Sequence, residues 1–138
     1  YLIEQLRDIL HLTKEWDVVL VGAGYLGHAL AHYRGFHRRG FRISWVFDND
    51  PDKIGLQMDE LVVQDVADLE KVISENDVKM AIIAVSANQA QEITDRLVAV
   101  GIRSILSYAP IHLNVPSGVE ISYSDPVIQL QRMTYYLS

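Results

Sequence analysis

The residues with the clearest capacity for ligand chemistry are three glycines in a short turn. Gly22, Gly24 and Gly27 form a G-x-G-x-x-G pattern. The pattern directly follows an apolar run at residues 18–21, and a helical stretch comes next. In this context Gly22 permits a tight turn, Gly24 lets the backbone approach a pyrophosphate, and Gly27 lets the helix pack close to the strand. The free N–H groups at the helix N-terminus favour phosphate, so the pattern predicts a dinucleotide-binding turn.

An acidic residue supplies the second half of this pattern. Asp48 follows a β-rich run at residues 41–47 and lies 21 residues after Gly27. An acid at this distance accepts hydrogen bonds from the ribose hydroxyls of NAD. A 2′-phosphate would face Asp48 together with Asn49 and Asp50, so the pattern favours NAD(H) over NADP(H). The alternative is that the glycines form only a tight turn and that Asp48 caps a loop.

The histidines offer little for catalysis or for metal binding. His112 follows a predicted strand closely and is the only credible base beside a cofactor, although a plain loop position near Pro110 is the favoured interpretation. His28 and His32 have the i, i+4 spacing of metal ligands, but no third ligand accompanies them, and a solvated helix face is the alternative. We therefore predict no catalytic residue, no metal site and no enzyme activity.

Alternating strands and helices must position these residues. Buried-strand patterns occur at residues 17–21, 41–47, 61–63, 79–85, 102–107 and 119–123. Helical spacing occurs at residues 25–34, 66–74 and 88–100, and Gly101 closes the last of these helices. Strands that are apolar throughout and separated by helices predict a parallel sheet covered on both faces. The predicted fold class is α/β, with a doubly wound, mostly parallel Rossmann sheet.

The composition fits one globular domain. The 138 residues are 49% hydrophobic and 22% charged, and no apolar run reaches the roughly 18 residues of a membrane span. The absence of cysteine excludes disulfides and thiolate zinc sites, and it fits a reducing cytoplasm. The net charge of −6 argues against nucleic-acid binding by the chain as a whole. Four arginines cluster without an acid, and a solvated loop is their simplest interpretation: Arg34, Arg38, Arg39 and Arg42.

The two ends of the sequence have helical patterns of different kinds. Residues 1–11 read as an amphipathic helix that connects to something upstream. Residues 126–137 read as a helix that starts after the N-cap Asp125 and carries apolar residues on every side. Such a helix must be buried, and a second copy of the protein is the simplest partner. Packing against its own sheet is the alternative.

The sequence resembles the ligand-binding domain of the Rex family of redox-sensing transcriptional repressors, over roughly residues 16–138. The resemblance depends on an ordered set of segments rather than on the glycine pattern alone. These segments are residues 19–27, 47–55 and 97–102, Ala109-Pro110, residues 113–116, and the closing helix with Leu130, Tyr135, Tyr136 and Leu137.

The resemblance implies a sensor of the NADH/NAD⁺ ratio in which NADH binding releases operator DNA from the full-length homodimer. It implies a connector at residues 1–15 after an N-terminal winged-helix domain that is absent here, an NAD(H)-binding Rossmann domain at residues 16–124, and a dimerisation helix at residues 125–138 that is exchanged between subunits. Operator DNA would be bound only through the absent domain, and no membrane is expected as a partner. Two alternatives remain open: a small NAD-dependent dehydrogenase fragment with His112 as base, and a CoA- or nucleotide-binding Rossmann module.

The expected cofactor-binding residues come from the glycine turn, the acidic segment after it, and the ends of two later strands. They are Gly22, Ala23, Gly24, Tyr25, Leu26, Gly27, Asp48, Asn49, Ile54, Val85, Ser86, Ala109 and Pro110.

Overall fold

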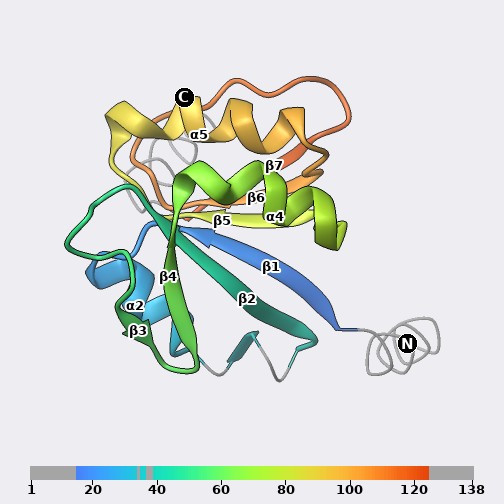
Figure 1. Ribbon diagram of the computed structural model, residues 1–138. Helices are drawn as coiled ribbons and strands as arrows, with labels where there is room; N and C mark the ends of the chain where they lie inside the picture. Colours follow the sequence, from blue (N-terminus) through green and yellow to red (C-terminus); the bar gives the residue numbers. More distant parts are fainter. Residues whose placement is uncertain (1–14, 34, 37–38, 125–138) are drawn as a thin grey trace.

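The computed structural model describes residues 15–33, 35–36 and 39–124. Its elements in chain order are β1 (Trp16–Val21), α2 (Tyr25–Ala31), β2 (Phe41–Asp48), β3 (Gln57–Met58), β4 (Leu61–Asp65), the 3-10 helix η1 (Val66–Asp68), α4 (Leu69–Asn76), β5 (Met80–Ile83), α5 (Ala87–Ala99), β6 (Ser104–Ser107) and β7 (Glu120–Tyr123), all shown in Figure 1. The helices predicted at residues 1–11 and 126–137 lie outside the described residues. The exchange of the last helix between subunits therefore stays a prediction.

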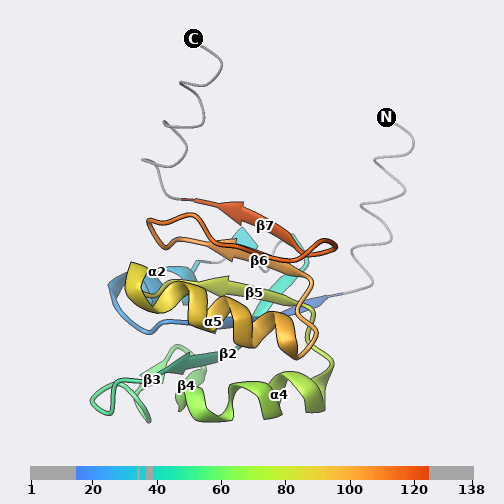
Figure 2. The same ribbon diagram turned by 90° about the horizontal axis from the view of Figure 1, so that it is seen from above.

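The strands form one sheet in the order β3-β4-β2-β1-β5-β6-β7, which Figure 2 shows from one edge to the other. All neighbouring strands are parallel except β3, which pairs antiparallel with β4. Each strand predicted from the sequence is present, and β3 is an addition. The predicted doubly wound, mostly parallel α/β sheet is confirmed.

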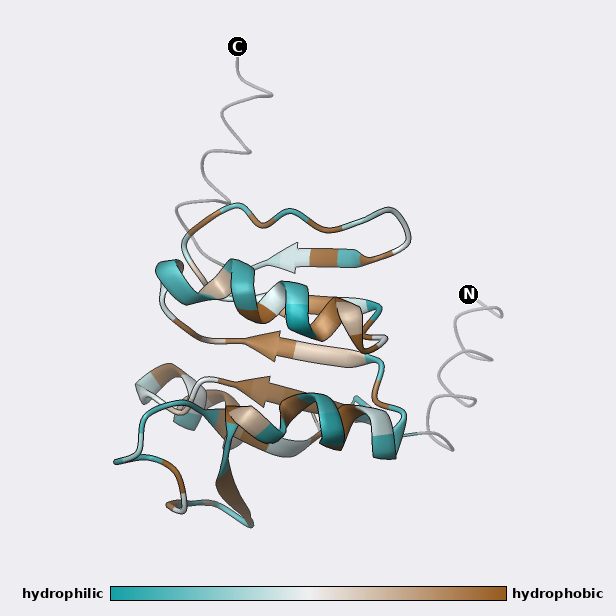
Figure 3. Cartoon of the chain, turned by 45° about the horizontal axis from the view of Figure 1, so that its top comes forward, coloured by the Kyte–Doolittle hydropathy of each residue, from teal (hydrophilic) through white to brown (hydrophobic). Residues whose placement is uncertain are grey.

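Alternate residues of the strands pack against opposite layers of the molecule. On one face, Val19 and Val21 of β1 join a buried cluster with residues of α4 and α5, among them Leu69 and Leu97. On the other face, Val18 and Leu20 join a cluster that includes Leu30 of α2. Figure 3 shows apolar colour along the central strands and polar residues on α4 and α5. The period-two alternation of buried side chains explains why both faces carry helices.

Some element bounds differ from the predicted ones. The helix predicted at residues 25–34 ends at Ala31, where the backbone N–H of the C-cap His32 donates to the carbonyl oxygens of His28 and Leu30. The helix predicted at residues 66–74 begins as the 3-10 turn η1, which Asp65 caps by accepting a hydrogen bond from the Ala67 N–H. Gly101 has φ +104° and follows the C-cap Val100 of α5, which confirms its predicted place at the end of that helix.

Within the described part of the chain, no helix is both long enough and apolar enough to cross a lipid bilayer.

Candidate functional site

A cleft of about 360 Å³ opens at the carboxyl edge of the central strands. β1 pairs with β2 on one side and with β5 on the other, so the chain leaves the sheet in opposite directions from neighbouring strands. Ligands of open α/β sheets bind at such a switch point. Six of the residues predicted from the sequence line the cleft: Gly22, Gly24, Asp48, Asn49, Val85 and Ser86.

Two of the three glycines in the glycine turn (residues 22–27) are required by packing. Gly22 has φ +117°, and a Cβ atom there would lie 2.3 Å from the carbonyl oxygen of Ala84. A Cβ atom at Gly27 would lie 2.0 Å from the carbonyl oxygen of Gly22. Because both neighbours are backbone atoms, neither position accepts a side chain without movement of the turn.

Gly24 differs from the other two glycines. Its backbone has φ −77° and ψ −163°, which any residue adopts. A Cβ atom there would meet only the Lys53 Nζ atom, at 3.7 Å, which is an ordinary contact. The fold therefore does not require glycine at this position, and the space above Gly24 opens into the cleft.

Asp48 connects the glycine turn to the acidic turn (residues 48–55). Its Oδ2 atom accepts a hydrogen bond from the Ala23 N–H at 2.8 Å, and its Oδ1 atom accepts one from the Asp50 N–H at 2.9 Å. An ionised carboxylate has about four acceptor sites, so roughly two remain for a ligand. Asp48 can thus fix the shape of the turn and still bind hydroxyl groups in the cleft.

One face of α5 forms a wall of the cleft that sequence reasoning missed. Gln89, Ile93 and Arg96 follow one another at spacings of four and three residues, and Glu92 lies beside them. This periodicity was visible in the sequence, and a helix that follows β5 must begin at the carboxyl edge of the sheet. Lys53 and Val66 also line the cleft, and the predicted site included neither.

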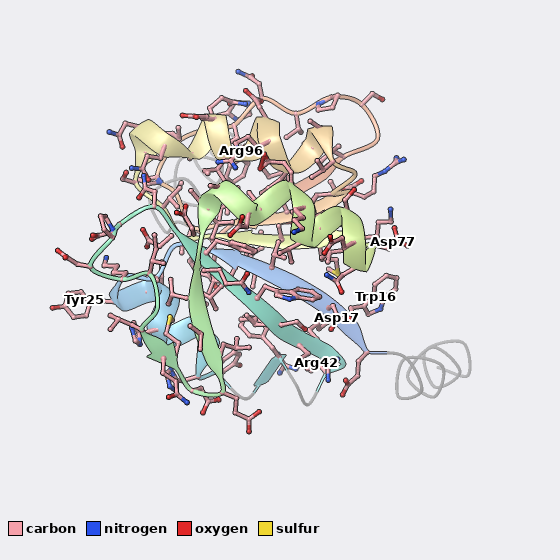
Figure 4. All side chains as sticks on the ribbon, viewed as in Figure 1. Trp16, Asp17, Tyr25, Arg42, Asp77 and Arg96 are labelled. Carbon is pink, nitrogen blue, oxygen red and sulfur yellow. The ribbon has the colours of Figure 1, made fainter. Side chains whose placement is uncertain are left out.

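Arg96 closes the far end of this wall by joining α5 to the neighbouring layer. Its Nε atom donates to the Glu70 Oε1 atom at 2.9 Å, and its Nη2 atom donates to the Val66 carbonyl oxygen at 2.7 Å. A second bond from Nη2 to the same Glu70 oxygen makes this an ion pair. Figure 4 shows Arg96 between α5 and α4. Two of its guanidinium nitrogens, Nε and Nη2, are therefore bonded within the protein.

The remaining predicted site residues lie outside the lining of the cleft. Ala23 and Gly27 are buried within the glycine turn, whereas Tyr25 projects into solvent with 99% of its surface exposed (Figure 4). Three others lie further away or face elsewhere: Leu26 is exposed, Ile54 is half-buried in the acidic turn, and Pro110 is exposed. Ala109 is fully buried in a cluster with Ala90, Leu113 and Tyr123.

The histidines discussed above lie on the surface. The His112 ring stacks near that of Tyr123, with centroids 5.9 Å apart, and it does not line the cleft. The rings of His28 and His32 stack 6.1 Å apart on α2. Among the residues that the structure describes, no group of three or more potential ligands could hold a metal ion. Arg42, from the arginine cluster, pairs with Glu15 and Asp17 at the opposite end of the sheet (Figure 4).

Several known proteins are similar to this chain. Residues 13–111 match the family described as a CoA binding domain. The redox-sensing transcriptional repressor Rex of Roseiflexus sp. (strain RS-1) is 52% identical over 137 residues, which are 99% of this chain and 62% of that protein. The Rex repressor of Brevibacillus brevis is 41% identical over all of this chain and 67% of its own length. The chain thus spans less than two thirds of the length of the Roseiflexus relative. Both relatives are named as repressors and not as enzymes, which agrees with the prediction that the chain is not an enzyme.

Solved structures give the same result. The Rex-family repressor RSP in complex with β-NADH superimposes with a TM-score of 0.84 and 34% identity, over 99% of this chain and 66% of that one. RSP in complex with β-NAD⁺ and operator DNA gives a TM-score of 0.85 at the same identity, over 99% of this chain and 63% of that one. The resemblance found in the sequence is confirmed, and the chain belongs to the Rex family of redox-sensing transcriptional repressors.

Proposed function

We propose that this chain is the NAD(H)-binding sensor region of a transcriptional repressor that responds to the NADH/NAD⁺ ratio. The observation that carries the proposal is the backbone at Gly24, because its glycine is not needed by the fold and faces an open cleft. A dinucleotide explains this glycine, since its pyrophosphate must come close to the backbone of the turn. RSP, a relative with the same fold, binds both β-NADH and β-NAD⁺.

The cleft suggests how the parts of the ligand would be held. The free acceptor sites of Asp48 would bind the hydroxyls of the adenosine ribose. Val66 and Ile93, which line the cleft, would provide apolar contact for the adenine ring. Val85 and Ser86 line the cleft after β5, and in this proposal they would face the nicotinamide half of the ligand. In this proposal the dinucleotide is sensed rather than consumed.

In the whole protein, this chain would be joined to a DNA-binding domain. Residues 1–15 would connect to a winged-helix DNA-binding domain, residues 16–124 would form the NAD(H)-binding domain, and residues 125–138 would form a dimerisation helix. NADH binding would release operator DNA from the homodimer. The coverage of 62% of the Roseiflexus relative and the RSP complex with operator DNA support a DNA-binding region in the remaining part. A protein that acts on operator DNA would work in the cytoplasm.

Titration of the chain with NADH, NAD⁺, NADPH and CoA tests the ligand assignment, with the fluorescence of Trp16 and Trp45 as the signal. We expect saturable binding of NADH and NAD⁺ without turnover. NADPH should bind at least about tenfold more weakly, because its 2′-phosphate would lose hydrogen bonds at Asp48 and meet its charge. CoA is included because the matched family is described as a CoA binding domain. Preference for CoA, or steady oxidation of NADH with an added substrate, would contradict the proposal.

Asp48→Ala sharpens this titration. Loss of charge-assisted hydrogen bonds to the ribose should weaken NADH binding by about 10- to 150-fold, which corresponds to about 1.5–3 kcal/mol. Glu60→Ala is the matched control, because Glu60 is exposed and lies outside the cleft. Unchanged NADH affinity in a folded Asp48→Ala variant would remove Asp48 from the proposed site.

A further inference from the structure

One cationic side chain in the cleft, Lys53, takes no part in the contacts described above. It lies in the acidic turn between β2 and β3 and is half-buried. Its Nζ atom is 3.7 Å from the place where a Cβ atom of Gly24 would be. The ammonium group therefore lies above the stretch of backbone that has no side chain, at the point where a pyrophosphate would come closest to the protein.

The backbone of Lys53 is fixed by hydrogen bonds within the acidic turn. The Lys53 N–H donates to the Asp50 carbonyl oxygen at 2.9 Å, and the Leu56 N–H donates to the Lys53 carbonyl oxygen at 3.0 Å. The Asp50 N–H in turn donates to Asp48, whose second oxygen holds the glycine turn at Ala23. One carboxylate thus sets the position of both turns, so the base of the Lys53 side chain has a defined place relative to Gly24.

The charges around Lys53 leave its ammonium group available. Within residues 15–33, 35–36 and 39–124, the Lys53 side chain makes no hydrogen bond and no ion pair. The other cation of the cleft, Arg96, is held by Glu70 and by the Val66 carbonyl oxygen. Three carboxylates also line the cleft, and they repel an anionic ligand: Asp48, Asp50 and Glu92. A dinucleotide would bring negative phosphates into this acidic cleft, where the Lys53 ammonium, unpaired among the described residues, can compensate their charge.

We propose that the Lys53 ammonium binds a phosphate of the dinucleotide, as a side-chain contact added to the backbone of the glycine turn. This inference rests on the proposed function of the cleft and assigns a ligand-binding role to a residue outside the glycine pattern. Because the side chain is partly exposed, the contact is screened by salt. The affinity contributed by Lys53 is therefore larger at low ionic strength.

Three variants test the contact. Lys53→Met removes the charge and keeps an apolar stem, Lys53→Arg keeps the charge, and Lys71→Met is the matched control on the exposed surface of α4, outside the cleft. Each is titrated with NADH at about 50 mM and 300 mM salt, ionic strengths at which charge screening differs strongly. Thermal unfolding without ligand accompanies each titration and should be unchanged in Lys53→Met, because the side chain makes no hydrogen bond in the described residues.

We expect Lys53→Met to weaken NADH binding by about tenfold at low salt and by clearly less at high salt. Lys53→Arg and Lys71→Met should bind NADH within about threefold of the unmodified chain, as expected when the charge is kept or is far from the ligand. Equal NADH affinity of Lys53→Met and the unmodified chain at low salt would overturn the role of Lys53 while the proposed function stands. Failure of the unmodified chain to bind NADH would instead overturn the proposed function, and this inference with it.

Discussion

Two loops leave parallel strands at the same edge of the sheet, and they are held in different ways. The glycine turn after β1 is fixed from outside, by Asp48 at the Ala23 N–H and by the Phe47 carbonyl oxygen at the Gly22 N–H. The loop after β6 (residues 108–119) is fixed by side chains that fill and bond it. Its Ala109 and Leu113 are almost completely buried.

The hydrogen bonds of the second loop close it against the body of the domain. The Tyr123 hydroxyl accepts from the Leu113 N–H at 2.8 Å and donates to the Leu113 carbonyl oxygen at 3.2 Å. The side chain of Gln91 bonds both the N–H and the carbonyl oxygen of Asn114. The few bonds at the base of the glycine turn leave its backbone open toward the cleft. The second loop is instead packed through its own buried Ala109 and Leu113 and bonded by side chains of α5 and β7. The contact of Ala109 and Pro110 with a cofactor stays a prediction.

The largest expected effect of a substitution is on the stability of the glycine turn. Gly22→Ala combines a strained positive φ with an overlap at the Ala84 carbonyl oxygen, and we expect it to lower the free energy of unfolding by about 4 kcal/mol. Gly118→Ala in the second loop is the control, because Gly118 has φ +93° and open space around it. Backbone strain alone should cost about 1–2 kcal/mol there. Denaturant unfolding compares the two, and equal losses would show that the overlap with Ala84 is not decisive.

A smaller effect is expected in the second loop. Tyr123→Phe leaves the buried Leu113 N–H without its partner, which should cost about 1–3 kcal/mol of unfolding free energy. Tyr108→Phe is the control, since the Tyr108 hydroxyl makes no hydrogen bond within the described residues, and its loss should stay within about 0.5 kcal/mol. NADH affinity should be close to that of the unmodified chain in both variants. A stable Tyr123→Phe variant with lost NADH affinity would mean that the second loop contacts the ligand directly.

Much of the sheet, together with the glycine turn and Asp48 of the candidate site, could be predicted from the sequence. Apolar strand runs and the spacing from Gly27 to Asp48 are local or near-local signals that a single sequence carries. The strand β3 could not be predicted, because a two-residue strand has no periodicity. It forms through pairing with β4 around a turn in which Asp59 has φ +56°.

The contacts that Asp48 and Lys53 make with the glycine turn could not be predicted from the sequence. The sequence predicted Asp48 as a ligand contact, but not that it bonds Ala23, which lies 25 residues earlier in the chain. Lys53 reaches Gly24 only because the acidic turn is tied to that same carboxylate. Contacts between distant segments depend on the folded turn, and neither composition nor spacing encodes them.

The smallest expected effect on stability belongs to Gly24, and it tests the central claim directly. Gly24→Ala fits the existing backbone, and the entropy gained in the unfolded chain opposes the weaker N-cap preference of alanine at the start of α2, so the free energy of unfolding should change by less than about 1 kcal/mol. The added methyl group would hold a pyrophosphate away from the turn. We therefore expect NADH affinity to fall by about tenfold or more, the effect of losing a charge-assisted hydrogen bond. Thermal unfolding and NADH titration of this one variant measure both quantities: retained stability with lost binding is the predicted result, and a stable variant that binds NADH as well as the unmodified chain would contradict it.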